Sequence, residues 1–393
     1  MWSAKRTYLD WAAAAPVSKN AERAFSAALK AFGNPSSPHE EGRRARAILE
    51  EARTGIARLA GTKPDAVVFT AGATEANALA VLGRIEALRV AGRSYESMHV
   101  LYLPSAHASI RGAVGMLRGR GVQLEEMSIR DGRMDLAKLK EQLRPETVLV
   151  SVDAVCGETG AMYKVRDVRR ALDAFGKESG TNVTLHADAS QAPFVESFEL
   201  SHLGADLVSL DAQKIGAIRG IGCLIAPRRT VLTPLFTGGG QERGLRPGTE
   251  SPALAAAFAE SLSEAEAGRE AFLTRATAMR AELIETIRGG VRGLAINEGK
   301  EQAPHILNMS LVGRDTDYLV ALLDEAGFAV STKSACETDS AEGSRAVRAL
   351  TGDAARAEST LRISWGPGVP DAALKRFACA FIDAVRFLDA HAI

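Results

Sequence analysis

Short apolar runs alternate with amphipathic segments over the first half of the chain. Two of these segments, 73–88 and 165–179, carry apolar residues at helical spacing. The apolar runs, which predict strands, lie at 66–70, 98–103, 148–152, 183–188 and 206–210. Strands that alternate with helices indicate right-handed crossovers and a mainly parallel α/β sheet. Ligands of such sheets bind at the carboxyl ends of the strands.

The second half of the chain begins with an Ala- and Glu-rich stretch. It covers residues 251–288 and predicts one extended helix. The remaining elements that the pattern predicts are strands at 305–312 and 360–365 and helices at 315–326 and 373–390. We place a domain boundary inside the long helix. The predicted domains are a large one of residues 16–260 and a small one of residues 1–15 and 261–393.

Length and composition favour a globular protein that binds a small molecule. The 393 residues exceed one ordinary core and suit two packed domains, with 46% apolar and 24% charged residues. Lys plus Arg and Asp plus Glu both number 48, and no long basic block occurs, so neither nucleic acid nor a membrane surface is an expected partner. The N-terminus lacks a signal-peptide pattern and no apolar run reaches roughly 18 residues, which predicts a cytoplasmic protein.

The four cysteines, Cys156, Cys223, Cys336 and Cys379, lie far apart in the sequence. This spacing gives neither a disulfide framework nor a zinc site, and no metal is expected. Most of them are expected to be reduced and buried. Cys336 differs, because it lies in a polar loop (STKSACETDS) near a lysine, which favours an accessible, reactive thiol. An incidental loop cysteine is the alternative.

Three polar motifs follow successive predicted strands. Residues 70–75 (TAGATE) open a helix, where backbone N–H groups and the Thr74 hydroxyl can bind a phosphate. Asp188 is the last residue of the strand predicted at 183–188, and Lys214 follows the strand predicted at 206–210. A phosphate turn, an anion and a lysine are the parts of a pyridoxal phosphate (PLP) site, since the anion keeps the ring nitrogen protonated and the lysine forms a Schiff base. Taken singly, each has an alternative: an N-cap threonine, an N-cap aspartate and a surface lysine.

Six motifs occur in this order along the chain: YLDWAAAAP, GNPSSPH, TAGATEAN, HADASQA, GGGQERGLRPGT and VSTKSACETDS. Lys214 lies between the fourth and the fifth of them. With them, the sequence resembles the cysteine desulfurases, fold-type I PLP enzymes of the class-V aminotransferase group. The resemblance covers residues 8–366. It implies an α/β fold in which a large domain surrounds a mainly parallel seven-stranded sheet and a smaller α+β domain carries the cysteine loop.

The resemblance also implies roles for residues around the cofactor. Lys214 would hold PLP covalently, Asp188 would pair with the pyridine nitrogen, and Gln191 would bind the phenolic oxygen. His107 would stack on the ring, although it could also be a histidine at a helix N-terminus with no such role. The phosphate ligands would be Ala73, Thr74 and, from the neighbouring subunit of a homodimer, Thr249.

The substrate residues implied by the resemblance are Arg362, Asn34 and Cys336. Arg362 would bind the carboxylate of L-cysteine, with an ordinary strand-end ion pair as its alternative. Asn34 would lie near the substrate entrance, although an Asn-Pro turn explains it as well. Cys336 would take the sulfur as a persulfide and release alanine. The long loop around it is typical of a subgroup that passes sulfur to iron–sulfur scaffold or tRNA-thiolation proteins.

Several positions depart from the family pattern. Cys156 and Gly157 replace two adjacent asparagines, so the contact that the second makes with cofactor and substrate is lost. Asp211 and Gln213 replace a serine that binds the phosphate and a histidine beside the Schiff base. Trp11 and the alanines after it make the substrate entrance more apolar. We expect weaker cofactor retention, unless Asp211 turns away and pairs with an arginine.

The sequence therefore predicts a PLP-dependent L-cysteine desulfurase. One alternative is a selenocysteine lyase or a related PLP enzyme that acts on another β-substituted amino acid. A second alternative is a degenerate desulfurase-like protein that works as a sulfur-relay or binding partner, which the lost asparagine and the altered phosphate site would favour.

Overall fold

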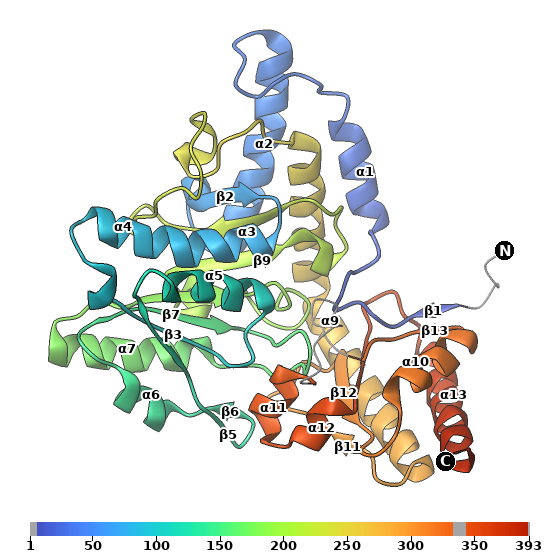
Figure 1. Cartoon of the computed structure of the whole chain (residues 1–393). Helices are drawn as coiled ribbons and strands as arrows, with labels where there is room; N and C mark the ends of the chain where they lie inside the picture. The colour runs from blue at the N-terminus through green and yellow to red at the C-terminus, as the bar shows by residue number, and fades with distance from the viewer. Residues whose placement is uncertain (1–5, 333–342, 392–393) are drawn as a thin grey trace.

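A seven-stranded sheet of order β2-β10-β9-β8-β7-β3-β4 forms the centre of the computed structural model, which describes residues 6–332 and 343–391 (Figure 1). Its strands are β2 (Val67–Thr70), β3 (His99–Tyr102), β4 (Gln123–Glu126), β7 (Thr147–Asp153), β8 (Thr184–Asp188), β9 (Leu207–Asp211) and β10 (Gly222–Ile225). Only β10 runs antiparallel to its neighbours in this sheet. The mainly parallel sheet is thereby confirmed, and β4 and β10 are the two strands that the apolar pattern misses.

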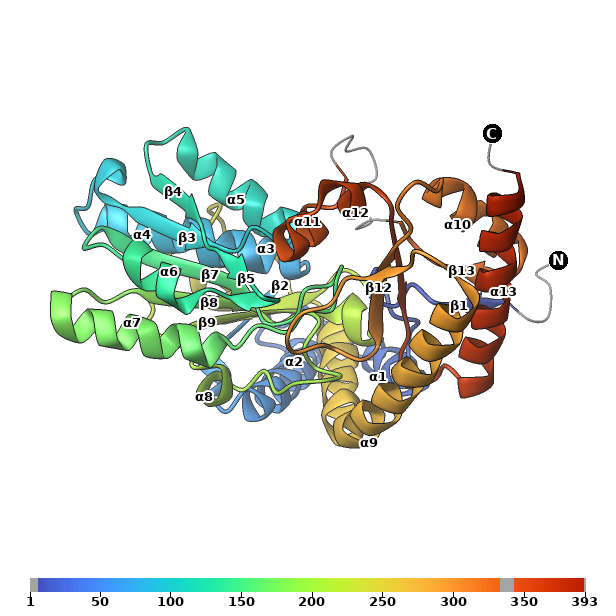
Figure 2. The same ribbon diagram turned by 90° about the horizontal axis from the view of Figure 1, so that it is seen from below.

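Helices cover both faces of this sheet. Figure 2 shows α3 and α5 on one side and α2 and α7 on the other. The helices of this part are α1 (Lys19–Ala28), α2 (Glu40–Leu59), α3 (Ala73–Ala78), α4 (Arg84–Val90), α5 (Ala108–Arg118), α6 (Leu136–Gln142), α7 (Val165–Ser179) and α8 (Leu200–Leu203). A π-helical turn over Leu79–Gly83 joins α3 to α4, so the helix predicted at 73–88 is present with one irregular turn.

Polar side chains inside the central strands are satisfied by one another. His186 in β8 is fully buried, and its two ring nitrogens lie 2.9 Å from the hydroxyls of Ser151 in β7 and Ser209 in β9. Burial lowers the pKa of His186 to about 4, so the ring is neutral at pH 7. His186 thus joins three adjacent strands, two residues before Asp188 at the end of β8.

The remaining part of the chain is built on the long helix α9 (Pro252–Gly290). Ser251 caps it and Pro252 opens it, as the local sequence favours. The other elements are β1 (Thr7–Tyr8), β11 (Ala295–Ile296), β12 (Ile306–Ser310), α10 (Thr316–Glu325), β13 (Phe328–Ala329), α11 (Arg345–Thr351), α12 (Ala354–Glu358), β14 (Thr360–Ser364) and α13 (Asp371–Ala390), with the hairpin β5 (Ile129–Arg130) and β6 (Arg133–Met134) extending toward them from the large sheet.

Helix α9 packs on α1 and α2 at one end and on α13 at the other, so it connects the two parts (Figure 1). Strand β1 pairs with β13, and β12 lies between β11 and β14 in an antiparallel sheet. The exact division at residue 260 stays a prediction. Within residues 6–332 and 343–391, none of the helices combines the length and the apolar character that a membrane crossing requires.

Candidate active site

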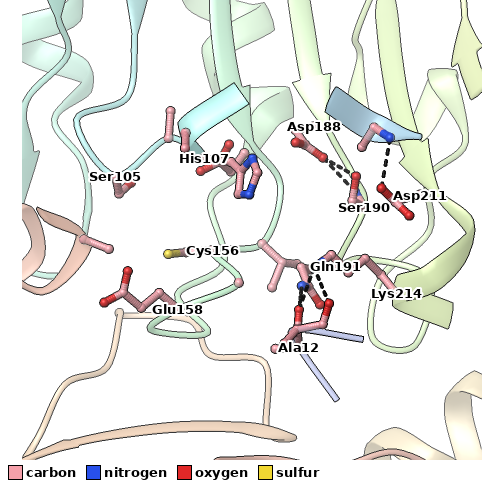
Figure 3. Close-up of a pocket in the computed structure, with 18 of the residues that line it drawn as sticks. Ala12, Ser105, His107, Cys156, Glu158, Asp188, Ser190, Gln191, Asp211 and Lys214 are labelled. Carbon is pink, nitrogen blue, oxygen red and sulfur yellow. Dashed lines mark hydrogen bonds between the residues drawn. The ribbon is translucent and has the colours of Figure 1, made fainter. Parts of the chain in front are cut away.

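A cavity of about 280 Å³ lies at the carboxyl ends of β7, β8 and β9, between the large sheet and β14 (Figure 3). The loops and helix starts that follow these strands form its walls, as expected for an α/β sheet. The residues proposed from the sequence that line it are Ala73, Thr74, His107, Gly157, Asp188, Gln191, Asp211, Gln213, Lys214 and Arg362. The fold therefore brings together residues that lie far apart in the sequence, such as Ala73 and Arg362, which are separated by 289 positions.

Lys214 is partly buried in the turn that follows β9. Its Nζ donates to the backbone carbonyls of Ala12 and Ala13, at 2.9 and 2.8 Å. These carbonyls belong to the segment between β1 and α1, and this segment is anchored in turn by Gln191, whose Nε2 donates to Ala12 O at 2.8 Å. The amine is thus fixed at the cavity wall and is not the solvated surface lysine that was the alternative.

Asp188 lies at the end of β8 and is 8% exposed. Its Oδ1 accepts from the backbone N–H and the hydroxyl of Ser190, at 2.9 and 2.6 Å, and its Oδ2 accepts from Asn77 Nδ2 at 2.7 Å. No helix begins at Asp188, so the N-cap alternative does not describe it. Donors on both oxygens stabilise a carboxylate in the cavity wall.

His107 stands at the start of α5, where its Nδ1 accepts from the backbone N–H of Ser109 at 3.2 Å. The imidazole is exposed to the cavity, and partial desolvation by the surrounding atoms lowers its pKa. The histidine therefore acts as a helix cap and also lines the site. Stacking of His107 on the cofactor ring stays a prediction.

Arg362 projects from β14 and is 3% exposed. Its guanidinium donates to Asp10 Oδ1 at 2.6 Å and to the carbonyl of Gly157 at 3.0 Å, while its Nε has no hydrogen-bond partner among the described residues. The ion pair expected of an ordinary strand-end arginine is present, and the guanidinium nevertheless lines the cavity. An anion that entered the cavity would compete with Asp10 for it.

The turn expected to bind phosphate carries an unexpected contact. Asp211 is 8% exposed, and its Oδ2 accepts from the backbone N–H of Ala73 at 2.9 Å. Its Oδ1 accepts from the N–H of Gln213 at 3.0 Å. Asp211 therefore turns to backbone donors of the phosphate turn rather than to an arginine. Arg246, an arginine near the same turn, pairs with Glu75 at 3.1 Å and does not line the cavity.

Cys156 and Gly157, which replace two asparagines, both line the cavity, and Figure 3 shows Cys156 on the side of Glu158. Cys156 is buried, and burial raises the pKa of its thiol to about 11. A Cβ atom on Gly157 would come within 3.0 Å of Gln191 Nε2, so a larger residue there would displace Gln191. Gln191 thus occupies the space that a side chain at position 157 would need.

Trp11 and the alanines divide between two surfaces. Ala12 and Ala13 line the cavity and make that part of its wall apolar, as expected. Trp11 does not: it lines a neighbouring groove with Phe194 and packs against Gly366. The expectation that Trp11 itself makes the substrate entrance apolar is wrong, because its ring turns to the far side of the segment.

Two residues proposed from the sequence lie away from this cavity, and the position of a third is not described. Asn34 Oδ1 accepts from the N–H of Ser36 at 2.9 Å in the loop before α2, so the turn explanation applies. Thr249 lines a separate cavity of about 220 Å³ with Arg246. Cys336 lies outside the described residues. The substrate role of Asn34 and the reach of Thr249 to a neighbouring subunit stay predictions.

The sequence analysis assigned no role to several residues that line the cavity: Ser105, Arg111, Asp153, Glu158, Ser190 and Arg345. Asp153 could have been found, because it ends β7 as Asp188 ends β8 and the two are register partners. Burial and the charge of Asp188 raise the pKa of Asp153, although the backbone N–H of His107 donates to it. Arg111 and Arg345 carry no sequence signal of this kind and are found only in the fold.

The aminotransferase class-V family model matches residues 7–377 of this chain. The chain belongs to the class-V aminotransferase family. It is 32% identical to an IscS-like cysteine desulfurase of Mycobacterium tuberculosis over 91% of each chain. It is also 32% identical to a cysteine desulfurase IscS of Dechloromonas aromatica, over 91% of this chain and 87% of that one. These matches place it among the cysteine desulfurases of the family.

Solved structures agree with this assignment. A NifS-like protein superposes with a TM-score of 0.89 at 25% identity, covering 98% of this chain and 100% of that one. A protein described as SspA in complex with cysteine superposes with a TM-score of 0.78 at 28% identity, covering 92% and 99%. The fold-type I architecture implied by the motifs is confirmed.

The family is PLP-dependent. The residues present fit the pyridine nitrogen of the cofactor and its aldehyde with the neighbouring phenolic oxygen, whereas the phosphate end differs. Asp188, with donors on both oxygens, fits the pyridine nitrogen, and Lys214 and Gln191 fit the aldehyde and the phenolic oxygen. At the phosphate end Thr74 offers a hydroxyl, but Asp211 already accepts from Ala73 N–H. PLP therefore fits this site, with a carboxylate added to its phosphate end.

Proposed function

We propose that the protein is a PLP-dependent L-cysteine desulfurase that transfers the substrate sulfur to Cys336 and releases L-alanine. The observation that supports this most directly is the convergence of Lys214, Asp188 and Arg362 on one cavity. A lysine, a buried anion and an arginine are what an α-amino acid and PLP require together. A similar protein has been described in complex with cysteine, which supports the same substrate here.

Each of these residues has a defined task in the proposed reaction. Lys214 would hold the cofactor covalently. When its amine is not attached to the cofactor, it donates to the carbonyls of Ala12 and Ala13 and can carry a proton there. Arg362 binds the substrate carboxylate in place of Asp10. Bound PLP supplies the electron sink that weakens the bond between the substrate Cβ and its sulfur.

The cysteine segment is attached beside the cavity at both of its described ends. Ser331 exchanges two backbone hydrogen bonds with Arg362, and Arg345 and Ala346 line the cavity. These attachments support a Cys336 thiolate that attacks the substrate sulfur, so that an S–S bond forms as the C–S bond breaks. We further propose a homodimer that passes sulfur to an iron–sulfur scaffold or tRNA-thiolation protein.

Lys214→Ala tests the cofactor assignment. The variant should lose the absorbance of covalently bound PLP and all formation of alanine and sulfide from L-cysteine, because no other lysine of the described residues lines the cavity. Lys164→Ala, which removes a surface lysine paired with Glu301, is the matched control and should keep both. Retention of the absorbance in Lys214→Ala would disprove the assignment.

The two alternative functions are separated by products. A selenocysteine lyase would release alanine and selenide from L-selenocysteine and little or nothing from L-cysteine. A degenerate relay protein would release alanine from neither substrate even with added PLP. With a thiol reductant added to release the persulfide sulfur, alanine and sulfide formed in equal amounts from L-cysteine, and lost in Cys336→Ser, would support the desulfurase.

A further inference from the structure

The phosphate end of the cavity contains an anion that belongs to the protein. Asp211 Oδ2 lies 2.9 Å from Ala73 N, and a Cβ atom on Gly72 would come within 3.4 Å of the same oxygen (Figure 3). The carboxyl group therefore lies directly against the turn whose N–H groups a phosphate would need. Thr74, the next residue of this turn, lines the same cavity.

Charged and titratable groups surround this carboxyl group unevenly. The groups that face it are Lys214 from its own segment, Asp188 from β8, Cys223 from β10 and His107 before α5, while Glu75 of α3 pairs with Arg246. Lys214 favours the ionised form of Asp211. Burial is the larger influence, and together with Asp188 it raises the pKa of Asp211 above its ordinary value.

A phosphate monoester is mostly a dianion at neutral pH, because its second pKa is about 6. An ionised Asp211 would repel this dianion and would keep the N–H of Ala73. A protonated Asp211 would remove the repulsion and would offer an O–H donor to a phosphate oxygen. We propose that PLP binds the form of the protein in which Asp211 is protonated, so that cofactor loading takes up a proton at this residue. The inference rests on the proposed use of this cavity for PLP.

The sign of the pH dependence follows from this linkage. Proton uptake makes PLP affinity fall as pH rises, by up to about tenfold per pH unit. The fall extends from the pKa of Asp211 in the free protein to its still higher pKa beside the dianion. Attachment to Lys214 acts in the opposite direction, because the amine must lose its proton to react. A comparison that cancels the Lys214 contribution is therefore needed.

The test compares two ligands on the full-length protein without cofactor. PLP and pyridoxal, which lacks the phosphate, are titrated into wild type, Asp211→Asn and Asp211→Ser between about pH 6.5 and pH 8.5, a range in which the phosphate is mainly a dianion. Absorbance gives the affinity, and calorimetry in two buffers gives the protons taken up. Asp65→Asn removes a surface carboxylate that pairs with Arg228 and is the matched control.

Asp211→Asn and Asp211→Ser should bind PLP at least about tenfold more tightly than wild type at the upper end of this range. Wild type should take up more protons with PLP than either variant, by up to one per site. Pyridoxal affinity should be the same in all of them, and Asp65→Asn should match wild type. Circular dichroism checks that both Asp211 variants fold, and the two replacements guard against failure of one.

Three results would overturn the inference: equal proton uptake in wild type and variants, weaker PLP binding in both variants, or the same change for pyridoxal as for PLP. Binding of PLP without release of alanine would remove the desulfurase proposal and leave this inference standing. A protein that binds PLP in no variant would remove both.

Discussion

Three buried aspartates, Asp153, Asp188 and Asp211, share the cavity with Lys214, and each is 8% exposed or less. Asp188 has donors on both oxygens, whereas Oδ1 of Asp153 has no hydrogen-bond partner among the described residues. Burying several carboxylates together is unfavourable unless some take up protons. Single residues here thus set how the site responds to an incoming dianion.

Cys156 has a thiol that lines the cavity, and the pKa of this thiol decides its role. At a pKa of about 11 only about one molecule in ten thousand carries the thiolate at pH 7. We expect Cys156→Ser to keep sulfide production within about threefold of wild type. After treatment with L-cysteine, alkylation and mass spectrometry should find the persulfide on Cys336, with Cys336→Ser as the negative control. A persulfide on Cys156 would contradict this.

At the scale of elements, the segment between β1 and α1 holds Lys214 through two carbonyls, and this segment is itself held by Trp11. The Trp11 ring packs on the backbone of Gly366 just after β14, where a Cβ atom would come within 2.0 Å of it. Position 366 therefore requires glycine, because the Trp11 ring lies too close to its backbone for a side chain. The position of the lysine depends in this way on a contact between the two ends of the chain.

Gly366→Ala should therefore destabilise the protein by about 1–3 kcal/mol, because Trp11 or the backbone must move. The variant should also bind PLP more weakly, since the carbonyls of Ala12 and Ala13 shift. The midpoint of thermal unfolding and a PLP titration measure the two effects. Gly368→Ala is the control, because nothing lies within 4 Å of a Cβ atom there. Equal behaviour of the two variants would refute the role of Trp11.

At the scale of the whole molecule, the segment before Thr249 is held in a specific shape. Glu242 and Arg243 have positive φ angles of 48° and 62°, and Arg53 holds the buried Glu242 by an ion pair at 2.7 Å. Backbone strain of this kind persists where the surroundings enforce it, often at functional sites. It supports the proposal that this segment presents Thr249 to a second copy of the chain.

The homodimer proposal predicts complementation between two defective chains. Thr249→Ala should weaken PLP binding, and Lys214→Ala should abolish covalent attachment. A mixed dimer contains one intact site, which joins Lys214 of one chain to Thr249 of the other. Isolated mixed dimers should regain half of the high-affinity PLP absorbance, because one of their two sites is intact, and light scattering should give the mass of two chains. No recovery in verified mixed dimers would show that Thr249 acts within its own chain or not at all.

The sequence by itself determined five of the seven strands of the large sheet, the long helix α9 and the order of the PLP motifs. These features depend on local periodicity and on residue types at strand ends, which a single chain displays directly. It also identified Asp211 and Gly157 as departures. The terminal location of Asp153 was equally visible but carried no motif.

Only the tertiary structure decided how the departures are accommodated. Asp211 could repel a phosphate, pair with an arginine or accept from a backbone N–H, and the choice depended on the turn at Ala73, which lies 138 residues away. Likewise, Gly157 meets Gln191, and Trp11 turns from the cavity to Gly366. Such contacts join distant segments, and they follow from how the elements pack rather than from any local pattern of residues.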